Sequence, residues 1–263
     1  MLLQAVATSV VNVILVLSPH LDDAAFSVGP FLAKFSNRAR IIVATAFTKS
    51  ELNPSDFALA CQLDKGLSAE TDYMAIRRKE DIEWSRRIGA EVVHGPFAEA
   101  PHRGYQSAKE LFGSVLESDK LKYSLTSWLK DLDLIFNPKI ILCPIGVGNH
   151  VDHLWIHKVA LHSFDSKPPL LFFKDQPYSS KLDLFHTEDY FINGNTLGKI
   201  KVPYSKNSVN IAKVAAEAYQ TQIPFQFGDI DQMKNMLGKV WGQSLFLFHN
   251  HALSELDNIF ITT

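Results

Sequence analysis

Two short clusters of histidine and aspartate hold the residues best suited to chemistry in this 263-residue chain. The first consists of His20, Asp22 and Asp23 and directly follows the apolar run VNVILVL at 11–17. Two adjacent carboxylates repel each other, and the end of a buried strand is poorly hydrated. A positive partner is therefore expected at this position, and we interpret it as a metal ion.

A helix cap is the simpler alternative for the first cluster. Asp22 or Asp23 could cap a helix that begins near Ala24. A cap explains one aspartate, but it leaves the other aspartate and His20 without a role. In a tight turn, residues three positions apart can converge, so His20 and Asp23 are expected to share one ion while Asp22 faces a water on it.

The second cluster lies in GVGNHVDHLWIHKVA, residues 146–160, and follows the apolar run at 139–144. Its potential ligands are His150, Asp152, His153 and His157. Asn149 or Asp152 could instead cap the following helix and leave the histidines in solvent. His157, one turn after His153, is the member most easily explained by helix surface or packing.

Apolar, β-branched runs alternate with helical patterns along the chain. The predicted strands are 11–17, 40–47, 90–95, 139–144 and 169–174, with weaker patterns at 188–192 and 199–203. The predicted helices are 24–36, 72–88, 121–136, 153–165 and 207–223. The long connections 48–71 and 95–120 are expected to carry function. This alternation predicts an α/β fold, a Rossmann-like doubly wound, mainly parallel sheet with helices on both faces.

The whole chain, residues 1–263, is expected to form a single α/β domain. Residues 1–165 would be the core that carries the metal site, and residues 166–263 a C-terminal extension of the same domain. Because the carboxyl ends of parallel strands meet at one edge of the sheet, the two clusters should meet there.

His20, Asp23 and His153 would then form a site of two histidines and one aspartate with one open position, which is typical of catalytic zinc. Iron(II) or cobalt(II) also suits these ligands. Zinc lowers the pKa of a bound water to about 7 and polarises a carbonyl group.

Three further residues would complete the catalytic group. Asp22 is expected to act as the general base. His150, oriented by Asp152, would stabilise an oxyanion or protonate a leaving amine.

The motifs SPHLDDA and NHVDH resemble those of the PIG-L/LmbE-like family of zinc-dependent N-deacetylases, (A/S)-H-P-D-D-E or P-H-x-D-D and H-P-D-H or H-x-D-H. The resemblance covers roughly residues 10–165. It implies the LmbE-like fold, zinc as cofactor and N-deacetylation as the reaction. The matching positions carry the same roles as above, with ligands His20, Asp23 and His153, base Asp22, and His150 with Asp152 as the acid or oxyanion partner.

The resemblance also suggests residues that bind substrate. RRKE supplies Arg77 and Glu80 of an R-x-x-E pattern, and APHRGYQ is similar to a substrate-side loop in the subgroup that acts on amino sugars of natural-product pathways. The candidate substrate-binding residues are Arg77, Arg103 and Tyr105. An arginine in such a position is more often solvated or salt-bridged than bound to substrate, and core packing explains Tyr105 at least as well.

Three positions depart from the family motifs. Leu21 and Val151 stand where proline is usual, and Ala24 stands where glutamate is usual. The first two change the stiffness of the turns without removing a ligand. Ala24 removes an acidic group that could support the site from behind the ligands.

The bulk composition excludes several classes of partner. Lys and Arg number 26 against 28 Asp and Glu, and no basic excess indicates nucleic acid or a membrane surface. The start of the chain has no Lys or Arg before Lys34, so we expect a buried strand there rather than a signal peptide. Cys61 and Cys143 lie far apart and imply no disulfide framework, which fits the cytoplasm.

The predicted function is zinc-dependent removal of an N-acetyl group from a small-molecule amino sugar or glycoside, by attack of a metal-bound water with Asp22 as base. A homo-oligomer is left open. The alternative is a metal-binding, non-catalytic Rossmann-like protein or partner subunit. A nucleotide-binding module would need a Gly-rich turn after the first strand, but SPHLDDAAFSVG lacks G-x-G-x-x-G, and its carboxylates would repel a pyrophosphate.

Overall fold

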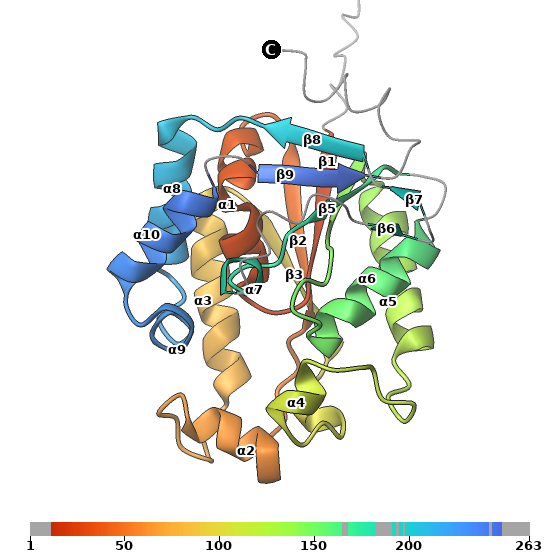
Figure 1. Cartoon of the computed structure of the whole chain (residues 1–263), viewed down its shortest axis with the longest axis vertical. Helices are drawn as coiled ribbons and strands as arrows, with labels where there is room; N and C mark the ends of the chain where they lie inside the picture. Colours follow the sequence, from red (N-terminus) through yellow and green to blue (C-terminus); the bar gives the residue numbers. More distant parts are fainter. Residues whose placement is uncertain are drawn as a thin grey trace, which may run out of the picture.

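The computed structural model describes residues 12–164, 168–181, 191–192, 195–196, 198–241 and 244–248. Its centre is a seven-stranded sheet in the order β3-β2-β1-β4-β5-β9-β8 (Figure 1). The strands are β1 (Val13–Ser18), β2 (Arg40–Phe47), β3 (Glu91–Phe97), β4 (Ile140–Pro144), β5 (Leu170–Phe173), β8 (Gly198–Val202) and β9 (Ser244–Phe248). The pairs among β1 to β5 are parallel, whereas β9 and β8 extend the β5 edge in antiparallel pairs. A separate hairpin pairs β6 (Phe191–Ile192) with β7 (Asn195–Thr196).

Helices cover both faces of the sheet. They are α1 (Asp23–Phe35), α2 (Asp56–Leu63), α3 (Tyr73–Ile88), α4 (Ala108–Leu111), α5 (Lys122–Phe136), α6 (Val151–Ser163), α7 (Tyr178–Lys181), α8 (Lys206–Ala216), α9 (Ile223–Phe227) and α10 (Ile230–Val240), with a 3₁₀ turn η1 at Ala100–Arg103. Helices α1, α3, α8 and α10 lie on one side of the sheet, and α5 and α6 on the other (Figure 1).

Strand β1 shows why both faces are covered. Successive side chains of a strand point to opposite faces, so Ile14 and Val16 join the core beneath α1 while Leu15 and Leu17 join the core beneath α5 and α6. Every residue of β1 is buried. The predicted doubly wound, mainly parallel sheet with two covered faces is therefore confirmed.

The strand order creates the position of the site. From β1 the chain moves outward through β2 and β3, then returns to pair β4 with the other side of β1. Helix α1 follows β1 onto one face, and α6 follows β4 onto the opposite face. A crevice at the carboxyl ends of β1 and β4 is the usual ligand position in such a sheet.

Two predicted connections contain short helices. The segment 48–71 includes α2, and the segment 95–120 includes η1 and α4. The predicted strand 199–203 corresponds to β8, whereas 188–192 lies outside the described residues except for β6. In the described ranges no helix combines the length and the apolar character needed to cross a bilayer.

The single helix predicted for 207–223 is wrong. Helix α8 ends at Ala216, and a turn separates it from α9, which begins at Ile223. Pro224 lies in the first turn of α9, where its missing N–H costs nothing and its fixed φ favours a new helix. This break turns the chain back toward the carboxyl edge of the sheet.

Candidate metal centre

The turn after β1 leaves Asp22 free to face the site. Asp22 occupies the position before α1 but makes no side-chain capping hydrogen bond. Ser18 supplies that bond instead, because its Oγ accepts from the N–H of Ala24 at 3.2 Å and donates to the carbonyl of His20 at 2.7 Å. The helix-cap interpretation therefore does not apply to the Asp22 side chain.

The turn after β4 requires backbone conformations that favour glycine. Gly146 and Gly148 have φ of 86° and 89°, and Asn149 has φ of 59°. A Cβ on Gly148 would lie 2.9 Å from the Cβ of Tyr178, so the loop packs against α7 too closely for a side chain. This tight turn brings His150 to the start of α6 and His153 to its first turn.

The three predicted metal ligands converge. Asp23 Oδ2 lies 3.2 Å from His20 Nδ1 and 3.2 Å from His153 Nε2. Such separations are about what two ligands roughly 2.1 Å from one shared ion require. His153 Nε2 is fully buried, and its contact with Asp23 Oδ2 does not have the geometry of a hydrogen bond. A buried nitrogen without a well-formed hydrogen bond is costly, which fits a metal ligand.

The other nitrogen of each histidine faces a buried carboxylate. His20 Nε2 lies 2.9 Å from Asp152 Oδ2, and His153 Nδ1 lies 2.5 Å from Asp175 Oδ1. Histidines that bind metals usually donate their second N–H to such a group, which fixes the ring and makes it a better ligand. The arrangement leaves His20 Nδ1 and His153 Nε2 for an ion.

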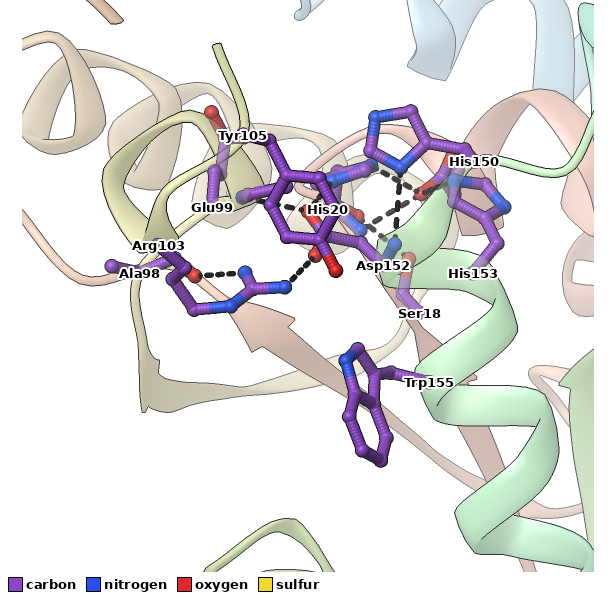
Figure 2. Close-up of polar contacts among 12 residues, drawn as sticks. Ser18, His20, Ala98, Glu99, Arg103, Tyr105, His150, Asp152, His153 and Trp155 are labelled. Atoms are coloured by element: carbon purple, nitrogen blue, oxygen red, sulfur yellow. Dashed lines mark hydrogen bonds and ion pairs between the residues drawn. The ribbon is translucent and has the colours of Figure 1, made fainter. Parts of the chain in front are cut away.

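His20, His150 and Asp152 form a second set of potential ligands. Asp152 is already committed in this set, since its carboxylate accepts from the N–H of Ala100 at 3.1 Å and from Arg103 Nη2 at 2.7 Å as well as from His20. Figure 2 shows Asp152 between Arg103 and the histidines. The first set, in which His153 Nε2 makes no hydrogen bond within the described part of the chain, is the better candidate for a metal site.

Asp175 is a site residue that the sequence analysis missed. It lies two residues after the end of β5 and accepts from the N–H groups of Gly146 and Val147, both at 2.8 Å, as well as from His153. The signal was present, because Asp175 directly follows the predicted strand 169–174 at the same edge of the sheet. Asp175 joins the β4 turn to His153, one of the three predicted ligands.

Asp22 is held by side chains from two distant segments. Arg77 Nη2 lies 3.2 Å from Asp22 Oδ1, and Arg77 also pairs with Glu99. Gln226 on α9 donates from Nε2 to Asp22 Oδ2 at 2.6 Å. Arg77 therefore fixes the position of Asp22, the predicted base, through an ion pair.

His150 is oriented by Asp152 in a different way from the one expected. The backbone N–H of Asp152 donates to His150 Nδ1 at 3.2 Å, whereas the Asp152 carboxylate binds His20 and Arg103. Because Nδ1 accepts, the ring proton of His150 lies on Nε2. That N–H is available for a ligand.

The other predicted substrate residues lie behind the site. Arg103 binds Asp119 and Asp152, and Tyr105 has no exposed surface and donates to Asp119 at 3.0 Å. Trp155 Nε1 also donates to Asp119, at 2.8 Å. These hydrogen bonds hold Asp152 in place. Direct binding of substrate by Arg77, Arg103 or Tyr105 stays a prediction, because the side chains of all three are already bonded to other residues of the protein.

A family model described as PIG-L, GlcNAc-PI de-N-acetylase, matches residues 15–164, which include both His/Asp clusters. The chain belongs to the PIG-L family. It is also 32% identical over 176 residues to a 2'-N-acetylparomamine deacetylase of Streptomyces fradiae, and the match spans 66% of this chain and 60% of that protein.

Solved structures confirm the PIG-L fold. The A40926 pseudoaglycone deacetylase is similar with a TM-score of 0.74 and 24% identity, over 89% of this chain and 96% of that one. The zinc-inhibited form of a teicoplanin deacetylase is similar with a TM-score of 0.73 and 21% identity, over 92% and 100% of the two chains. The predicted resemblance to the PIG-L family is confirmed, and the matches include deacetylases of natural-product amino sugars.

The three departures from the PIG-L motifs are buried apolar residues. Leu21 packs with Tyr73 and Met74, and Val151 packs in a small cluster that includes Tyr105. Ala24 belongs to the main core on the α1 side of the sheet. Hydrophobic packing therefore holds Leu21 and Val151, the two positions at which the motifs quoted above have proline.

Neighbouring charges determine the protonation of the ligands. Burial alone would lower the pKa of His153, but Asp23 and Asp175 outweigh it and raise the pKa to about 9. The pKa of His20 is likewise raised well above its usual value, because Asp152 and Asp23 outweigh burial. Burial would raise the pKa of Asp23, but His153 and His20 hold it well below its usual range.

Metal binding should therefore release protons. Below a pH of about 9 the metal-free protein holds His153 protonated, and an ion needs the neutral ring. Apparent zinc affinity should rise as the pH increases from 6 to 9. Titration calorimetry at pH 7 in buffers of different ionisation enthalpy should give enthalpies that depend on the buffer. Buffer-independent enthalpies would contradict this prediction.

Asp175→Asn tests the contact that the sequence analysis missed. Loss of the carboxylate that orients His153 should weaken zinc binding by about 10- to 100-fold, as measured by competition with a chelator. Asp81→Asn is the matched control, because Asp81 is a buried carboxylate 2.8 Å from the ring of His94 that contacts none of the three ligands. Equal effects of the two substitutions would show that Asp175 acts only through stability.

Proposed function

We propose that this chain is a metal-dependent N-deacetylase that hydrolyses the acetamide of an amino sugar or its glycoside and releases acetate. The convergence of His20 and His153 on Asp23, with Asp22 beside them, is the observation that carries the proposal. Membership of the PIG-L family and 32% identity to a 2'-N-acetylparomamine deacetylase support the reaction and the substrate class.

His20, Asp23 and His153 would hold the ion. Two imidazoles and one carboxylate suit zinc, and also iron(II) or cobalt(II). When bound, such an ion lowers the pKa of a coordinated water and polarises the substrate carbonyl. Because the similar teicoplanin deacetylase has a zinc-inhibited form, the amount of zinc supplied to this chain has to be controlled in any assay.

Asp22 would take the proton of the attacking water. Burial raises the pKa of Asp22 to about 6, although Arg77 opposes the rise. A carboxylate with a raised pKa is a stronger base than an ordinary aspartate and can return the proton later. Arg77 and Gln226 hold its two oxygens, so the direction of proton transfer is fixed. The proton gained by Asp22 would then pass to the leaving amine.

His150 would stabilise the tetrahedral oxyanion. Its Nε2 carries the proton, and its ring centroid lies 4.9 Å from that of His20 and 5.3 Å from that of His153. Burial, reinforced by the neighbouring His20, lowers the pKa of His150 to about 3. A neutral donor of this kind favours the oxyanion role over protonation of the amine.

The competing hypothesis is a metal-binding protein without catalysis, or a partner subunit. It predicts one bound ion per chain and no release of acetate. Every group of the proposed chemistry lies at the site, which favours the enzyme. Acetate release from N-acetylparomamine and a panel of N-acetylglucosamine glycosides separates the two hypotheses.

Asp22→Asn is the sharpest test of the proposed reaction. The amide keeps the shape of the side chain but cannot accept the proton, so kcat should fall by about 10²- to 10⁴-fold while metal content is unchanged. Acetate release and elemental analysis are measured on the same samples. Asp231→Asn, at an exposed position of α10, is the control and should match the wild type. An Asp22→Asn variant that keeps its rate would remove Asp22 from the mechanism.

A further inference from the structure

The C-terminal third of the chain reaches the site through Gln226. This residue lies on α9, and its Nε2 donates to Asp22 Oδ2 at 2.6 Å. The two residues are 204 positions apart in sequence. The break between α8 and α9 makes this contact possible, because a continuous helix over 207–223 would direct the chain elsewhere.

The position of α9 does not depend on its contact with Asp22. The backbone N–H and the hydroxyl of Thr221 both donate to Glu80 of α3, at 2.8 and 2.7 Å. Phe227 is buried, and its ring centroid lies 4.9 Å from that of Phe26 in α1. Gln226 is therefore held between a polar anchor and the hydrophobic core.

The amide of Gln226 has one group that the protein does not satisfy. A carboxylate only accepts hydrogen bonds, so the amide nitrogen must face Asp22 and the oxygen must point away from it. Gln226 Oε1 is fully buried and has no hydrogen-bond partner among the residues that the structure describes. A buried acceptor without a donor is unfavourable, which points to a donor from a ligand.

We propose that Gln226 is a positioning and specificity-determining residue: its Nε2 fixes Asp22, and its Oε1 accepts a hydrogen bond from a hydroxyl of the bound amino sugar. The inference rests on the proposed function. Asp22 must lie next to the scissile amide, so the hydroxyl belongs to a ring carbon adjacent to the acetamido carbon. Substrates that lack this hydroxyl leave Oε1 buried and unpaired, and the site discriminates against them.

Gln226→Met tests the positioning role, because methionine keeps the length of the side chain and removes both polar atoms. Its kcat/KM for an N-acetylglucosamine glycoside should fall ten- to a hundredfold, with metal content and melting temperature unchanged. Gln226→Glu keeps an acceptor but loses the donor to Asp22, so its loss should appear mainly in kcat. Gln220→Met is the control and should match the wild type, because Gln220 is exposed and its side-chain amide donates to the backbone carbonyl of Glu217.

A deoxy substrate tests the hydroxyl contact. Removal of the 3-hydroxyl from the glycoside should lower kcat/KM about tenfold for the wild type and have little effect on Gln226→Met. Two results would overturn this inference and leave the proposed function intact: an equal loss of kcat/KM in both proteins, or a wild type that releases acetate and a Gln226→Met variant that is equally active. A wild type that releases no acetate from any member of the panel would overturn the proposed function, and the inference with it.

Discussion

Buried negative charge at the carboxyl edge of the sheet is the constraint on which the site depends. Four aspartates, each 5% exposed or less, gather there: Asp22, Asp23, Asp152 and Asp175. Buried carboxylates persist only when they are paired and hydrogen-bonded. Arg77 and Arg103 each pair with one of them, and His20 and His153 pair with the others. The proposed ion would supply the remaining positive charge.

The charged groups are connected from loop to loop. Asp119 accepts from Arg103, Tyr105 and Trp155, and this fixes the long connection after β3 against α6. Arg103 in turn binds Asp152, which binds His20 on the loop after β1. Several loops thus determine the position of the His20 ring, and a change in the loop that carries Asp119 should alter that position.

The convergence of His20, Asp23 and His153 was predictable because its signal is local. His20 and His153 each follow a strand, and parallel strands bring their carboxyl ends together whatever the details of packing. The partners of those ligands depend on three-dimensional contacts. Asp152 was assigned to His150 because the two are close in sequence, but its carboxylate bonds His20 on the loop after β1. The contact of Gln226 with Asp22 was not predictable from the sequence, because it depends on how α9 packs against α1 and α3.

The direct test of this account is the position of the ion. Crystals grown with one equivalent of zinc, with anomalous diffraction measured at the zinc edge, should show a single peak bound by His20 Nδ1, Asp23 and His153 Nε2. His20 Nε2 should remain bonded to Asp152. A peak shared by His20 Nε2, His150 and Asp152, or His20 and His153 turned away from a common ion, would contradict it.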